Sequence, residues 1–189
     1  MKFKLTIILL ISIIIIETGH AQRNVFLDNT EASVILYGDA RKYEFVIEDV
    51  DSHFDKENMN IKVLFPVKNI KANNPNHLEM IEPLLKPFLY PVMSLVVNIS
   101  DETKNLNTYR DPVKMRKPAK MEFRGNQYEV PVQISLFSDG SSLFYNMYFR
   151  INLEEMDLLI TDKAMLGLTG IMEFLVSDGE WAEYFVDVY

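Results

Sequence analysis

The residue types that most often carry catalysis are few in this sequence and lie far apart. Beyond residue 21 the only histidines are His53 and His77, on separate segments. A nucleophile activated by imidazole needs that imidazole within hydrogen-bond reach. The sequence has no cysteine, no G-x-S-x-G pattern, no P-loop and no dinucleotide-binding glycine pattern. We therefore expect both histidines to be surface or helix-capping residues, and the protein not to be an enzyme.

Four carboxylates lie close together in the sequence: Asp49, Asp51, Asp55 and Glu57. Their spacing resembles a calcium-binding loop, but such a loop needs a glycine at its sharp turn and a glutamate at its twelfth position. Counted from Asp49, the twelfth residue is Asn60, and the glycine is absent. We expect a solvated acidic loop over residues 49–58, with no metal and no cofactor. Paired acids for glycosidic chemistry are defined by tertiary geometry, and the sequence singles out no such pair.

The first 21 residues have the pattern of a secretory signal peptide. Positive charges at the start precede an apolar run from Leu5 to Ile16, and Gly19 and Ala21 occupy the small-residue positions of a cleavage site. This run is shorter than the roughly 20 residues needed to span a bilayer. We expect a signal peptide over residues 1–21, no integral membrane segment after its cleavage, one domain over residues 22–189, and a periplasmic or secreted location.

The composition limits the partners. The full chain has a formal net charge of −8, and an acidic surface repels phosphate groups. We therefore expect no nucleic acid partner and no anionic membrane surface bound by charge. Without cysteine the chain forms no disulfides and no thiolate metal sites, so the fold must depend on its hydrophobic core.

Alternating apolar and polar residues predict a β-rich fold. Tyr43, Phe45 and Ile47 alternate with charged residues, and this period recurs along the chain. The alternating segments are 42–48, 60–65, 92–99, 120–124, 127–137 and 145–153. Segment 33–37 is continuously apolar, which predicts a strand buried on both faces.

Glycine-containing pairs predict the turns between these strands: Gly38-Asp39, Gly125-Asn126, Asp139-Gly140 and Asp178-Gly179. The last pair predicts a hairpin between strands at 171–176 and 181–188. The polar stretch 100–118 predicts a long surface loop. Eight or nine strands with short turns favour an antiparallel sandwich or barrel.

One segment has the apolar spacing of a helix. Asn74 is a suitable N-cap, with Pro75 at the first helical position. Four apolar residues then share one face: Leu78, Ile81, Leu85 and Phe88. Pro83 and Pro87 lie inside this pattern, and a proline in a helix interior costs about 3 kcal/mol or more. We expect two short turns broken near Pro83, and a strand that begins after Tyr90-Pro91.

Ten methionines and many aromatic residues give the chain an excess of apolar side chains at inward-facing strand positions. In an ordinary core, methionine fills irregular gaps. A barrel of about eight strands can instead enclose a ligand, walled by the same residues. The pattern does not separate a filled barrel from a hollow one, so both readings stay open.

Three stretches resemble the YceI-like family of exported proteins. His77-Leu78, the apolar helical residues and the run Tyr90-Pro91-Val92-Met93-Ser94-Leu95 are similar to the family's His-Leu, short helix and Tyr-Pro-x-Ile-x-Phe run. Val63-Leu64-Phe65-Pro66-Val67 is similar to the stretch ahead of the helix, and residues 151–176 look like the closing strand, loop and strand. The resemblance extends from Ala32 to Tyr189.

The resemblance implies an all-β protein with one short helical segment, folded as an antiparallel lipocalin-like β-barrel of about eight strands. Described members of the family enclose a long polyisoprenoid chain. We therefore expect an exported, non-enzymatic binding protein that holds an apolar lipid, such as a polyisoprenoid, inside the barrel. The residues expected to line the ligand are Phe45, Val63, Ile81, Leu85, Phe88, Met93, Leu95, Phe123, Tyr128 and Phe149. Among these, Ile81, Leu85 and Phe88 would close the barrel.

The alternative is a secreted β-sandwich or barrel with a solid core, which would use its surface to bind a protein partner. A homodimer is compatible with either reading.

Overall fold

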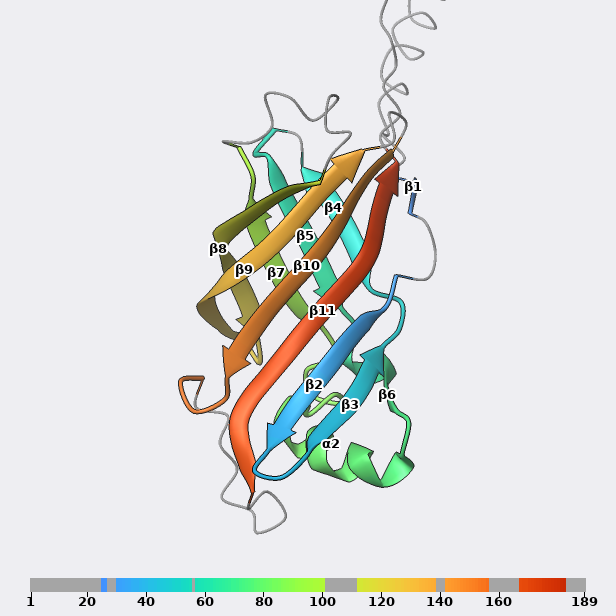
Figure 1. Cartoon of the computed structure of the whole chain (residues 1–189), viewed down its shortest axis with the longest axis vertical. Helices are drawn as coiled ribbons and strands as arrows, with labels where there is room; N and C mark the ends of the chain where they lie inside the picture. Colours follow the sequence, from blue (N-terminus) through green and yellow to red (C-terminus); the bar gives the residue numbers. More distant parts are fainter. Residues whose placement is uncertain are drawn as a thin grey trace, which may run out of the picture.

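The computed structural model describes residues 25–26, 30–55, 57–100, 112–138, 142–156 and 167–182 (Figure 1). The predicted signal peptide, the predicted turn at Asp139-Gly140 and the predicted strand beyond Ala182 lie outside the described residues. The strands are β1 (Val25–Phe26), β2 (Ala32–Gly38), β3 (Lys42–Ile47), β4 (Asp51–Asp55), β5 (Asn60–Phe65), β6 (Ile70–Ala72), β7 (Met93–Asn98), β8 (Val113–Phe123), β9 (Asn126–Ser138), β10 (Ser142–Asn152) and β11 (Leu168–Ala182). The helical segments are the 3-10 turns η1 (Val67–Asn69) and η2 (Pro75–His77) and the α-helix α2 (Leu78–Leu85).

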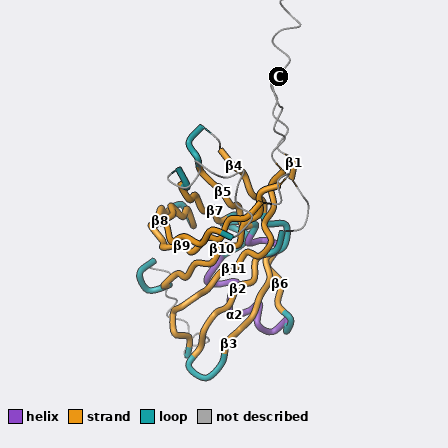
Figure 2. Tube along the Cα trace, turned by 45° about the horizontal axis from the view of Figure 1, so that its top comes forward, coloured by secondary structure: helices purple, strands orange, loops and turns teal. Residues whose placement is uncertain are grey.

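The described strands form one antiparallel sheet in the order β4-β5-β7-β8-β9-β10-β11-β2-β3-β6, and β1 pairs with β11. β3 and β4 lie near opposite ends of this order, yet only residues 48–50 separate them in the chain. The chain itself therefore brings the two ends of the sheet together. Figures 1 and 2 show the result, a curled sheet in which β4, β5 and β7 face β10 and β11.

This architecture confirms the predicted fold class, an antiparallel lipocalin-like barrel with one short helix. The sheet has eleven strands within the described ranges, compared with the predicted eight or so. The difference has a simple origin. β1 and β6 have two and three residues, and β3 and β4 are two parts of one strand, interrupted where Asp49 takes a positive φ of 57°. Eight strands result when β1 and β6 are left out and β3 and β4 are counted as one.

The period-two patterns predicted most inward faces. In β7, Met93, Leu95 and Val97 are fully buried, as predicted, and their neighbours are not. In β2 the prediction was wrong, because only one face is buried: Val34 and Leu36 point inward, whereas Ile35 is partly exposed. Apolar residues on the outer face of a strand give a continuous apolar run without burial on both sides.

Three loop predictions were also wrong. The acidic stretch contains the strand β4, which pairs with β5, and β8 begins at Val113, inside the predicted loop 100–118. The β8–β9 turn lies one residue earlier than predicted, at Arg124 and Gly125, since Phe123 pairs with Asn126. Both turn residues have positive φ, 54° and 78°, as a two-residue type I′ hairpin requires.

The predicted terminal hairpin at Asp178-Gly179 is instead a β-bulge inside one long strand, β11. The register against β10 shifts here, because Tyr145 pairs with Gly179 and Met147 with Val176. Asp178 takes a φ of 53°, and its N–H donates to Oδ1 of Asn146 at 2.8 Å. A side chain at Gly179 would collide with the ring of Tyr145, which explains the glycine at this position.

Candidate functional site

The helix α2 lies across one end of the barrel (Figure 1). Asn74 caps the preceding turn η2, as predicted: its Oδ1 accepts from the N–H of Asn76 at 3.1 Å. Ile81, Leu84 and Leu85 are the residues of α2 that are fully buried. The end of the barrel is therefore closed by an apolar helix face.

The predicted break near Pro83 was wrong, because α2 continues through Pro83 to Leu85. The loss of one backbone hydrogen bond is tolerated because the helix buries an apolar face against the barrel. The helix ends at Leu85, and its C-cap Lys86 takes a left-handed conformation with a φ of 47°. Phe88 therefore leaves the helical spacing and is 93% exposed. It does not close the barrel, contrary to the prediction.

The structure buries eight of the ten predicted ligand-lining residues: Phe45, Val63, Ile81, Leu85, Met93, Leu95, Phe123 and Phe149. Tyr128 is partly buried against the same core, and its hydroxyl donates to the carbonyl oxygen of Met156 at 3.2 Å. The structure thus brings nine of the ten into or against one apolar core. Their contact with a ligand remains a prediction.

Aromatic rings from opposite sides of the barrel meet in its interior. Phe149 and Phe174, on the paired strands β10 and β11, stack with their centroids 4.7 Å apart. Phe65, on β5, approaches both rings edge-on at 5.7 and 5.9 Å. Since β5 is not a neighbour of β10 or β11, this contact crosses the interior.

A polar pair crosses the interior as well. Ser52 of β4 and Tyr145 of β10 are hydrogen-bonded through their hydroxyl groups. Burial raises the pKa of Tyr145 to about 12, so this phenol is protonated at neutral pH and acts as a hydrogen-bonding group, not as a base. Among the described residues, Ser52 is the buried polar side chain that faces inward.

These contacts add Phe65, Tyr145 and Phe174 to the interior residues that the predicted site omitted. Alternation placed Phe65 and Tyr145 on inward faces. It did not show which strands would oppose each other across the barrel, because that depends on the curl of the whole sheet. No sequence signal paired Phe65 with Phe174.

Neither histidine takes part in an interior site. His53 lies on β4 with its Nε2 3.0 Å from Oδ2 of Asp51, and His77 packs edge-on against the ring of Tyr43. Within the described ranges, no group of three or more His, Cys, Asp or Glu residues is placed to hold a metal ion. No helix in those ranges is both long enough and apolar enough to cross a membrane.

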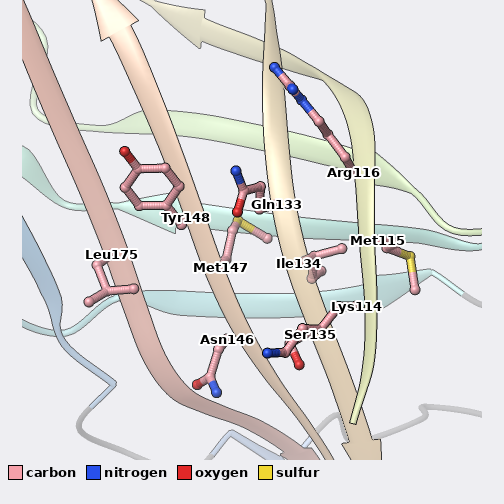
Figure 3. A pocket seen from close by; sticks show the side chains of 10 residues that line it. All are labelled: Lys114, Met115, Arg116, Gln133, Ile134, Ser135, Asn146, Met147, Tyr148 and Leu175. Atoms are coloured by element: carbon pink, nitrogen blue, oxygen red, sulfur yellow. The ribbon is translucent and has the colours of Figure 1, made fainter.

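The outer surface carries a different kind of site. A hollow of about 390 Å³ opens across β8, β9, β10 and β11 (Figure 3). Its outward-facing lining includes Lys114, Arg116, Gln133, Tyr148 and Leu175. This hollow is open to solvent on the outer face of the sheet and is separate from the interior, so it is not part of the proposed ligand site.

Beside this hollow, one carboxylate is buried on the outer face. Glu173 accepts hydrogen bonds from the hydroxyls of Tyr37 at 2.7 Å and Tyr148 at 2.8 Å, and from Nε of Arg150 at 2.9 Å. Burial alone would raise the pKa of Glu173, but these three donors outweigh it and lower the pKa below its usual value. The group joins β2, β10 and β11 from outside.

The fold and its apolar interior define a lipocalin-like barrel. Comparison with known proteins shows which solved structures share this fold. No protein-family model and no curated protein matches the sequence. A polyisoprenoid binding domain from Saccharophagus degradans, implicated in plant cell wall breakdown, matches with a TM-score of 0.67 at 9% identity over 83% of this chain and 97% of that one. BcnA of Burkholderia cenocepacia matches with a TM-score of 0.60 at 12% identity over 82% and 96%. The YceI protein of Campylobacter jejuni gives a TM-score of 0.49 at 12% identity over 88% and 92%. At these identities the likeness concerns the fold alone. This chain shares the barrel fold of the polyisoprenoid binding domain and of BcnA, which confirms the barrel fold that its motifs predicted.

Proposed function

We propose that this protein binds a long apolar ligand, an isoprenoid or another lipid, inside its barrel, outside the cytoplasm and without catalysing a reaction on it. The observation that carries this proposal is the apolar interior. The inward faces of the described strands and the buried face of α2 are largely apolar. The polar groups on these faces are the hydrogen-bonded pair Ser52 and Tyr145, the hydroxyl of Tyr128, and Lys117, which pairs with the inward-facing Val132 near one end of β8. Such a lining suits a hydrocarbon chain and offers few polar groups to a polar substrate.

The binding free energy would come from burying that chain. Each buried methylene contributes about 0.8 kcal/mol, from which the cost of ordering the ligand is subtracted. A long chain is favoured over a short one because this gain grows with every methylene. The fold likeness to a polyisoprenoid binding domain supports the same class of ligand.

The aromatic contacts across the interior favour a second candidate function. Phe65, Phe149 and Phe174 fill the space between β5 and the β10–β11 pair. With these rings in place the barrel has a solid core at this level, and the protein would act through its surface on a protein partner. A ligand would have to displace at least one ring, and Phe65 is the one that reaches across.

Organic extraction of the purified protein followed by mass spectrometry separates the two candidates. The carrier releases a lipid in near-stoichiometric amount, whereas the solid-core module yields none. A protein that carries no lipid and takes up no added prenyl lipid would overturn the carrier proposal.

A pair of variants on one strand locates the ligand. Leu95→Asp places a charge on the inner face of β7, where Leu95 is fully buried, and should abolish lipid retention, because burying an unpaired carboxylate beside a hydrocarbon is strongly unfavourable. Val96→Asp is the matched control on the outer face, where Val96 pairs with Lys62 and Lys120. It should retain the lipid. Circular dichroism of both variants checks that each is folded, and equal lipid content in the two would place the ligand elsewhere.

A further inference from the structure

The turn after α2 carries the most exposed large apolar side chains of the described structure. Phe88 is 93% exposed, Leu89 71% and Val92 45%. Two adjacent large apolar side chains that both point away from the protein are unusual here, because apolar and polar residues otherwise alternate along the strands. Exposed apolar groups of this kind commonly mark an interaction site.

The backbone holds these side chains outward. Lys86 adopts the left-handed conformation, and its carbonyl oxygen accepts from the N–H groups of Leu89 and Tyr90, each at 2.9 Å. Pro87 is buried, and the carbonyl oxygen of Pro91 accepts from the N–H of Lys68 at 3.3 Å. The apolar tip is therefore part of a defined turn, anchored on both sides.

The charges around the tip differ in sign from the chain as a whole. Lys86 and Lys68 are exposed beside it, and the guanidinium of Arg124 lies 5.6 Å from the centroid of the Tyr90 ring. Two acids lie close to these cations: Glu82, one helical turn before Lys86, and Glu122, which lines the hollow next to Tyr90. These three cations and two acids sum to a formal charge of +1, whereas the whole chain has a net charge of −8.

The size and shape of this surface indicate what it contacts. A stable protein interface buries about 800 Å² on each partner, far more than three side chains supply. A projecting pair of apolar residues with cations at its base suits the boundary of a lipid bilayer, where acyl chains accept the apolar groups and phosphates attract the cations.

We propose that the turn at residues 86–92 docks on a phospholipid bilayer, with Phe88 and Leu89 inserted among the acyl chains and Lys86, Lys68 and Arg124 facing the phosphates. Docking in this orientation brings α2, which closes the barrel, to the membrane surface. Transfer of a lipid between bilayer and barrel rests on the proposed function, whereas docking itself does not.

Sedimentation of the protein, prepared without the predicted signal peptide over residues 1–21, with vesicles of phosphatidylethanolamine and phosphatidylglycerol tests the proposal. Phe88→Ser and Leu89→Ser should each weaken vesicle binding about tenfold or more, because full burial of one such side chain changes an equilibrium by at least that factor. Lys86→Asn removes one cation and keeps a residue that tolerates positive φ, so it should weaken binding by a factor of a few. Leu175→Ser is the matched control, since Leu175 is 43% exposed on the outer face of β11. It should bind like the unmodified protein.

Any one of three results would overturn the proposal. The first is that the unmodified protein stays in the supernatant, and the second is that Phe88→Ser and Leu175→Ser bind vesicles equally well. The third is that light scattering shows a dimer that Phe88→Ser dissociates, because a second copy of the chain would then be the partner of this surface. Lipid extraction from the same preparations keeps the two proposals apart. A protein that contains lipid but does not sediment retains the carrier function without docking, and one that sediments without bound lipid docks without being a carrier.

Discussion

Glu173 is a carboxylate buried on the outer face of a barrel, where apolar side chains or solvent usually lie. It is 8% exposed, and three donors from β2 and β10 surround it. An ionised carboxylate is stable in such a place only when its oxygens are hydrogen-bonded. The hydrogen bonds from Tyr37, Tyr148 and Arg150 favour the ionised form and lower the pKa of Glu173 despite its burial.

Replacement of Glu173 by Gln should reduce the free energy of unfolding at pH 7 by about 1 to 3 kcal/mol, because charge-assisted hydrogen bonds are lost. The pKa of Glu173 is lower in the folded than in the unfolded protein. Its contribution is therefore complete above the unfolded pKa, about 4.3, and is lost as the pH falls through the folded value. Urea denaturation at pH 7 and at pH 3 to 4 should show a difference between the two proteins that shrinks with acid. A constant difference across this range would contradict the assignment.

At the scale of elements, α2 shows how burial overrides a local preference. An interior proline removes a backbone hydrogen bond and disfavours a helix, yet α2 includes Pro83 because Ile81, Leu84 and Leu85 are buried together. The packing of this face contributes more than the proline costs. The helix ends two residues later at Leu85, and the next residue, Lys86, takes the left-handed conformation.

Replacement of Pro83 by Ala should raise the free energy of unfolding by about 1 kcal/mol or more, since it restores the missing N–H. This net gain already allows for the smaller entropic stabilisation that is lost with proline, which restricts the unfolded chain. Pro87→Ala is the control. Pro87 lies in the turn beyond the helix and is buried, so its replacement should leave stability unchanged or lower it. A Pro83→Ala protein that is less stable than the unmodified one would show that the pyrrolidine ring packs in an essential way.

The elements also show what the sequence could predict. Alternation is a local property of a strand, so the inward residues of β5, β7 and β10 were predicted correctly. The role of Asp178-Gly179 was predicted incorrectly, because the same pair of residues is compatible with a turn or with a bulge. Pairing with the long strand β10 on both sides of the pair makes it a bulge. Phe88 was misplaced because helical spacing was extended beyond the left-handed residue Lys86. The contact of Phe65 with Phe149 and Phe174 depends on the curl of the sheet, which no short pattern contains.

At the scale of the whole molecule, the two candidate functions predict different consequences of removing one aromatic ring from the interior. Phe65 is fully buried and reaches across to β10 and β11. Replacement of a buried Phe by Ala typically costs about 3 to 5 kcal/mol, part of which comes from the cavity left behind. In a solid core nothing refills that cavity. In a lipid-binding barrel the cavity enlarges the space for the ligand's chain.

The carrier proposal therefore predicts that Phe65→Ala is strongly destabilised after delipidation and that added prenyl lipid restores much of the loss. A ligand present at 100 times its dissociation constant stabilises the folded state by about 2.7 kcal/mol, which is comparable to the cost of the cavity. Thermal denaturation with and without lipid measures both quantities. Ile35→Ala, on the partly exposed outer face of β2, is the control, and lipid should shift its midpoint no more than that of the unmodified protein. If lipid left the midpoint of Phe65→Ala unchanged, the interior would be a solid core, and the function would have to be sought on the outer surface.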